Sequence, residues 1–141
     1  MQLAVLKTPS AILKMLEIGL TIIIISVSQG VNFFSFGSGP RTFFCGGVLV
    51  LALVVSCLLL ATYLMGSAKD LQKTPFELMM NAVLAVLMMS AGAVTINTGI
   101  EFQHAPFKNN PADAINAAGS LAIINSVFYG IDTYFAKLNM D

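Results

Sequence analysis

The stretch Ala117–Asp132 reads AAGSLAIINSVFYGID and decides the fold of the chain. It is too apolar for a helix on the surface of a soluble protein, because such a helix carries a polar face opposite its apolar stripe. Two residues stand out against it: Asn125 lies in the middle and Asp132 closes it. An amide and a carboxylate within an apolar helix indicate a segment surrounded by lipid that touches protein at a few positions.

The composition of the whole chain also favours a membrane protein. Of its 141 residues, 57% are hydrophobic and 10% are charged, whereas soluble domains carry about 25% charged residues. The mean hydropathy is +0.84. So few charges cannot cover a globule of this size with solvated side chains. The formal net charge is zero, so there is no basic field to attract nucleic acid.

Four apolar runs each exceed the roughly 20 residues that a helix needs to cross the hydrocarbon core. They are Ile12–Phe33, Thr42–Met65, Pro75–Thr98 and Pro111–Ala136. Backbone groups in lipid must pair within their own segment, so these runs should be helices. Short connections make successive helices antiparallel neighbours. The sequence therefore predicts an all-α fold, a single transmembrane domain over residues 1–141 that forms an antiparallel four-helix bundle.

Residues that start and stop helices lie at the ends of these runs. Thr74–Glu77 reads TPFE and is typical of a capping box with proline at the first helical position. Asn110–Asp113 repeats the pattern with Asn and Asp. Gly66 and Gly99 stand where we expect the second and third helices to end.

Basic residues are distributed unequally between the two sides of the predicted bundle. One side holds Lys7, Lys14, Lys69, Lys73 and Lys137, and the other holds Arg41 and Lys108. Cytoplasmic segments next to membrane spans carry the excess of lysine and arginine. We therefore expect both termini in the cytoplasm and the first and third connections outside.

In this arrangement several polar residues of the first, third and fourth runs share one depth. We predict an intramembrane polar cluster of Lys14, Glu17, Asn81, Tyr129 and Asp132. Its expected ion pair joins Lys14 to Asp132 or to Glu17. A packing clasp or snorkelling to water is the favoured interpretation, and an ion or proton site is the alternative. Asn125 lies deeper, where its amide is expected to bond another helix.

Small residues recur every four positions along the fourth run. They are Ala114, Ala118, Ala122, Ser126 and Gly130. Such a row lets two helix backbones approach closely, so that dispersion contacts hold them together in lipid. The third run is also rich in alanine, serine and glycine between Ala82 and Ala93. We therefore predict a tight pair of the third and fourth helices.

The two outer connections are unusually aromatic. They contain Phe33, Phe34, Phe36, Phe102 and Phe107. Aromatic side chains anchor a chain at the membrane interface, and an exposed apolar patch can also contact a neighbouring molecule. Both interpretations stay open, and we predict lateral self-assembly with these residues at or near the contacts.

No pattern in the sequence predicts catalysis, a cofactor or a metal site. Cys45 and Cys57 form no CxxC pair and are expected to be inert thiols. His104 is the sole histidine and has only Glu101 as an acidic neighbour. We therefore expect a protein that is not an enzyme and whose surroundings are membrane lipids and other protein chains.

Three of the runs resemble helices of the MARVEL-domain family. KMLEIGLTIIIISV, at Lys14–Val27, is similar to the first helix of that family. FELMMNAVLAVLMMSAGAVT, at Phe76–Thr95, resembles the third helix, and GSLAIINSVFYGIDTYFA, at Gly119–Ala136, resembles the fourth. The fourth helix of the family often ends in Tyr-x-x-Asp, which corresponds here to Tyr129 and Asp132. Within the family, the compact size is most like a protein of insect smooth septate junctions.

The resemblance implies a four-helix membrane protein without catalytic residues and with both termini in the cytoplasm. Such proteins organise cell junctions, membrane appositions or vesicle membranes, often as homo-oligomers. The expected location is the plasma membrane at cell junctions. Two alternatives remain: an accessory subunit of a larger membrane transport complex, and a proteolipid-like subunit that carries ions on a carboxylate of its fourth helix.

Overall fold

The structure is a computed structural model that describes residues 3–29, 39–104 and 112–140. These residues are helical, with no strand among them. The four long helices are α1 (Pro9–Gln29), α2 (Pro40–Thr62), α4 (Pro75–Gln103) and α5 (Ala112–Met140). A short 3-10 helix (Leu3–Lys7) precedes α1, and a wide helical turn (Tyr63–Ser67) and the short helix α3 (Ala68–Gln72) join α2 to α4.

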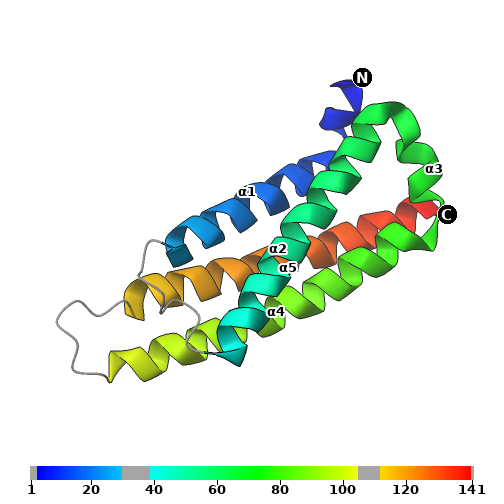
Figure 1. The fold of residues 1–141 in the computed structure, drawn as a ribbon. Helices are drawn as coiled ribbons and strands as arrows, with labels where there is room; N and C mark the ends of the chain where they lie inside the picture. Colours follow the sequence, from blue (N-terminus) through cyan, green and yellow to red (C-terminus); the bar gives the residue numbers. More distant parts are fainter. Residues whose placement is uncertain (1–2, 30–38, 105–111, 141) are drawn as a thin grey trace.

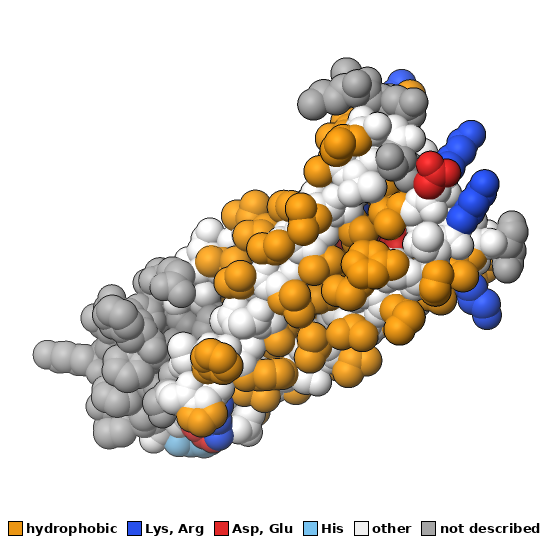
Figure 2. Space-filling model, turned by 45° about the vertical axis from the view of Figure 1, so that its right-hand side comes forward, with side chains coloured by type: hydrophobic (Ala, Val, Ile, Leu, Met, Phe, Trp, Pro, Cys, Tyr) orange, Lys and Arg blue, Asp and Glu red, His pale blue; other side chains and the backbone are white. Residues whose placement is uncertain are grey.

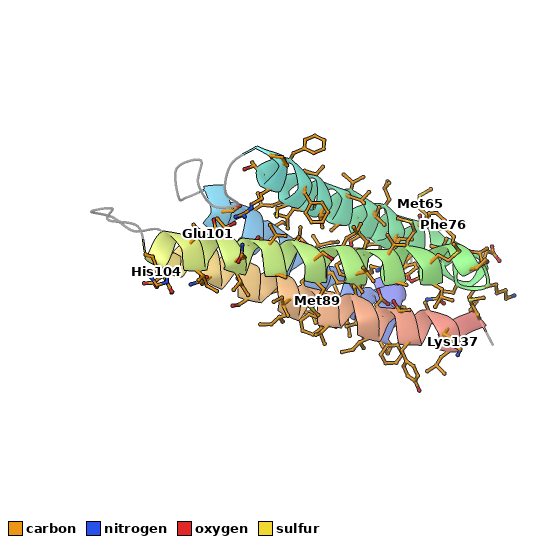
Figure 3. All side chains as sticks on the ribbon, turned by 90° about the horizontal axis from the view of Figure 1, so that it is seen from below. Met65, Phe76, Met89, Glu101, His104 and Lys137 are labelled. Carbon is orange, nitrogen blue, oxygen red and sulfur yellow. The ribbon has the colours of Figure 1, made fainter. Side chains whose placement is uncertain are left out.

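The four long helices form an up-and-down bundle whose first and last helices also pack together (Figure 1). The most extensive contact is between α4 and α5, followed by α1 with α5, α1 with α2, and α2 with α4. The described residues nearest the two termini lie at the same end of the bundle, which we call the terminal end (Figure 1). Glu101 and His104 lie at the opposite end, and Phe76 and Lys137 at the terminal end (Figure 3).

All four helices are long and apolar enough to cross a membrane. Large apolar side chains such as Val50, Leu58, Val86 and Val127 are about half exposed or more on the outside of the bundle. Figure 2 shows one face on which such side chains run along the helices, while Lys and Arg side chains gather at the ends. This surface suits a hydrocarbon solvent, because large apolar side chains exposed along the helices would be costly to hydrate.

The helix limits differ from the predicted spans in one informative way. The sequence predicts a stop at Gly99, but α4 continues through it to Gln103. Gly99 is buried, and a Cβ there would collide with Asn116 of α5. This glycine therefore serves close packing rather than termination. Gly66 does interrupt its helix, with a φ of 88° that residues with a side chain rarely adopt.

The prediction of a capping box at Thr74–Glu77 is wrong, although α4 does begin at Pro75. The Thr74 hydroxyl donates to the carbonyl of Leu71 at 2.6 Å. Glu77 is 1% exposed, and neither of its carboxylate oxygens has a hydrogen-bond partner. Its side chain is buried in the bundle and does not turn back to the start of the helix. Burial among the other helices therefore outweighs the local capping hydrogen bond at this position.

The tight α4–α5 pair is built around two facing glycines. A Cβ on Gly119 would lie 2.7 Å from Cγ1 of Ile96 and 3.0 Å from the Gly92 carbonyl oxygen. A Cβ on Gly92 would lie 2.9 Å from the Gly119 carbonyl oxygen. Real side chains do not pack so closely, so only glycine permits this approach of the two backbones.

The predicted small-residue row is partly wrong. Ala118, Ala122 and Ser126 are buried, but Ala114 is only half-buried and Gly130 is exposed. A step of four residues turns about 40° past a full helical turn, so a row of five drifts around the helix by about 160°. Gly130 therefore leaves the packed face. The row also omits Gly119, which makes the closest contact.

We predict that Gly119→Ala lowers the free energy of unfolding by about 1–3 kcal/mol, because its methyl group overpacks the α4–α5 contact. The matched control is Gly47→Ala on α2, where a Cβ meets no atom within 4 Å and alanine favours the helix. Unfolding of both variants in mixed detergent micelles, followed by circular dichroism, checks this. Equal stability of the two variants would refute the close approach.

Candidate functional site

The ammonium group of Lys14 on α1 lies at the centre of a buried polar cluster. Its Nζ donates to Oε2 of Glu17 at 3.0 Å and to Oδ1 of Asn81 on α4 at 2.5 Å. It also lies 2.5 Å from Oδ2 of Asp132 on α5. Tyr129 of α5 places its ring centroid 5.4 Å from the same nitrogen. The structure thus brings together all five residues of the predicted cluster.

Complete burial distinguishes this cluster from side chains that snorkel to water. Lys14, Glu17, Asn81, Tyr129 and Asp132 are each 0% exposed. A buried charge loses its hydration, and only close partners compensate for that loss. Lys14 meets this requirement with oxygens from three helices. The cluster therefore ties α1, α4 and α5 to one another through a single cation.

A layer of neutral hydrogen bonds surrounds the charged group. Asn125 donates through Nδ2 to the hydroxyl of Thr21 at 3.0 Å and lies 3.4 Å from the carbonyl oxygen of Glu17. The expectation that Asn125 bonds another helix is thereby confirmed. The hydroxyls of Ser56 on α2 and Tyr129 lie 2.7 Å apart. This second contact brings α2, the one long helix that Lys14 does not bind, into the same network.

Sequence reasoning missed two members of this network, Thr21 and Ser56, and also missed the burial of Tyr63 and Glu77. All four are 0–1% exposed. The signal for Glu77 was available, since it stands four residues before Asn81 and so shares its helix face. The cap pattern at the same position obscured it. Hydroxyl residues such as Thr21 and Ser56 give no such signal, because they also bond their own helix in lipid.

A second polar contact lies at the other end of the bundle, between α2 and α4. Arg41 donates to both carboxylate oxygens of Glu101, at 3.0 and 3.1 Å, and to the Thr98 hydroxyl at 3.3 Å. The two charged side chains are 39% and 57% exposed. The paired geometry fixes the start of α2 beside the end of α4. Sequence reasoning used Arg41 only to orient the chain.

The predicted outer contacts lie outside the described residues. This applies to Phe33, Phe34, Phe36 and Phe107. Phe102 belongs to α4, but its side chain is not among those described. Their role in contacts stays a prediction.

Residues with other chemistry lie apart from the cluster. Cys45 is buried, with its thiol 3.7 Å from the carbonyl oxygen of Ala91, and Cys57 is exposed on α2. His104 is exposed just beyond the end of α4. Across residues 3–29, 39–104 and 112–140, no group of His, Cys, Asp and Glu side chains could hold a metal ion.

These features define a multi-pass integral membrane protein whose polar side chains are turned into the bundle. A family model for MARVEL, the membrane-associating domain, matches residues 5–135. The chain therefore belongs to the MARVEL family, which is membrane-organising and non-enzymatic. Comparisons with characterised proteins and with solved structures give no match.

We predict that Lys14→Met lowers the free energy of unfolding by about 3–5 kcal/mol, because it leaves buried carboxylates without their cation. Lys69→Met is the control, since Lys69 is exposed on α3 and its loss costs at most a few tenths of a kcal/mol. Detergent unfolding curves of the two variants test this. A Lys14→Met protein as stable as Lys69→Met would show that the cluster does not hold the helices together.

Proposed function

We propose that this chain is a non-enzymatic membrane-organising protein that assembles laterally at cell junctions or other membrane appositions. The observation that carries the proposal is the family match over residues 5–135 on a bundle of four membrane-length helices. The resemblance of its helices to MARVEL proteins, among them the insect snakeskin protein of smooth septate junctions, is the reason why we favour a junctional plasma membrane as its location.

The outer surface of the bundle supports assembly within the membrane. Among the described residues, most of the surface belongs to the four long helices, which offer large apolar contact areas. Gly130 on α5 is exposed and a Cβ there would meet no atom of the chain. A small residue at the surface of a membrane helix allows a second helix to approach closely. We therefore place a contact with a second copy at the Gly130 face of α5.

The proposed orientation has both termini in the cytoplasm. The terminal end carries the exposed residues Lys7, Lys69, Lys73 and Lys137, while Arg41 lies at the opposite end beside Glu101. Since basic residues are retained on the cytoplasmic side of a membrane, this distribution supports a cytoplasmic terminal end.

A tag accessibility experiment tests the orientation. Epitope tags placed before Met1 and after Asp141 should bind antibody only after the plasma membrane is permeabilised, because both tags lie in the cytoplasm. A tag inserted in the connection between residues 104 and 112 is the control and should bind without permeabilisation. Binding of either terminal tag to intact cells would contradict the proposed orientation.

Gentle extraction from native membranes tests the assembly. We expect particles that contain several copies of this chain, and tagged protein concentrated where neighbouring cells touch. Gly130→Leu should reduce the number of copies per particle while the free energy of unfolding of each copy changes by less than about 1 kcal/mol. Gly47→Leu on α2 is the control and should leave particle size unchanged.

The same experiment distinguishes the proposal from its rivals. Recovery of one copy together with a fixed number of different chains would indicate an accessory subunit of a larger complex. An even distribution over internal membranes would exclude a junctional role.

A further inference from the structure

The buried cluster contains more hydrogen-bond acceptors than donors. Its oxygens without a hydrogen-bond partner are Glu17 Oε1, Asn125 Oδ1, both Oδ1 and Oδ2 of Asp132, and both Oε1 and Oε2 of Glu77, although Asp132 Oδ2 forms the ion pair with Lys14. Among the buried side-chain groups without a partner, those that can donate are the Asn81 amide and the Tyr63 hydroxyl. Buried acceptors without donors are costly in a low-dielectric interior, so the cluster lacks at least one proton.

Lys14 cannot supply the missing donor. An ammonium group carries three N–H bonds, and three oxygens already surround Nζ, from Glu17, Asn81 and Asp132. Among the described residues the other lysines are exposed, and Arg41 is paired with Glu101 at the far end. Glu77 therefore has no cation of its own.

The charge count leads to the same conclusion. Glu17, Glu77 and Asp132 are three buried carboxyl groups, and Lys14 is the one buried cation among the described residues. If all three were ionised, they would carry two negative charges more than Lys14 can compensate. Isolated ions in such surroundings become neutral rather than remain charged.

We propose that the cluster is a proton-binding site in which Glu77 is held as the neutral carboxylic acid. Glu17 and Asp132 each have a carboxylate oxygen beside Nζ of Lys14, whereas both oxygens of Glu77 are unpartnered. A proton from water forms an O–H bond on the Glu77 carboxylate, which removes its negative charge and turns one of its oxygens into a hydrogen-bond donor. The proton returns to water when the site empties.

The position of Glu77 defines the side from which the proton enters. It lies in the first turn of α4, two residues after Pro75, at the terminal end of the bundle. The charged groups that face it are Asp132 of α5 and Lys14 of α1. Proton exchange therefore takes place at the terminal end and needs no path across the membrane.

The site makes the stability of the bundle fall as the pH rises. The folded chain holds a proton on Glu77 that the unfolded chain releases near pH 4.3, the ordinary value for glutamate. Where the folded state binds more protons than the unfolded state, raising the pH destabilises the fold. Ionised Glu77 would add a negative charge beside Asp132, which loosens the contact of α4 with α5.

Infrared spectroscopy of the full chain in lipid nanodiscs tests the proposal. At neutral pH the wild type should show the C=O stretching band of a protonated carboxyl group, shifted by deuterium exchange, and the band should be lost at alkaline pH. Glu77→Gln should remove the band and make the melting temperature independent of pH over the alkaline range. Asp113→Asn, an exposed acid at the start of α5, is the control and should change neither.

Each other outcome overturns the proposal. Absence of the band in the wild type at neutral pH would show that the cluster binds no proton. A band that persists in Glu77→Gln would place the proton elsewhere. If Glu77→Gln does not fold, wild-type protein labelled with carbon-13 at the glutamate carboxyl gives the answer, because a band that the label fails to shift cannot arise from Glu77.

Discussion

The structure depends on the pairing of one buried ammonium group with oxygens from three helices. In lipid the hydrophobic effect does not hold helices together, since the surroundings are as apolar as the side chains. Lys14 provides what the solvent does not: Glu17, Asn81 and Asp132 approach its Nζ from α1, α4 and α5. The arrangement favours one rotation of α1, α4 and α5 about their axes, because these contacts require the polar side chains of the three helices to face Lys14. A buried ion pair contributes specificity in this way even where its net stabilisation is small.

Close packing and polar contacts hold the helices together at different positions along the bundle. Gly92 and Gly119 bring the middle of α4 against α5, and the Lys14 cluster fixes the same pair at the terminal end. At the other end, Arg41 and Glu101 join α2 to α4. The apolar side chains on the described outer surface are therefore not needed for these contacts between helices. This is consistent with a protein whose partners are lipids and other membrane proteins.

The number and class of the helices followed from the sequence, because lipid allows a chain of this apolarity only backbone structures that bond internally. The cluster could also be predicted, since Lys14, Glu17 and Asp132 cannot face lipid at a shared depth. The predictions that were wrong concern details that depend on tertiary contacts. Gly99 packs against Asn116 instead of ending a helix. Glu77 fits a local capping pattern but is buried, and the position of Gly130 depends on the accumulated rotation of α5, which a four-residue spacing does not reveal.

The contacts of α2 with the other long helices are less extensive than the contacts among those helices, and this affects how the bundle responds to the bilayer. Two of its side-chain contacts are the Ser56–Tyr129 and Cys45–Ala91 bonds, and a third is the Arg41–Glu101 pair at its start. The other three long helices share the Lys14 cluster. When the thickness or tension of the bilayer changes, spanning helices respond by tilting. Among the four long helices α2 has the least extensive contacts with the others, so its tilt is the one that we expect to follow a change in bilayer thickness most readily.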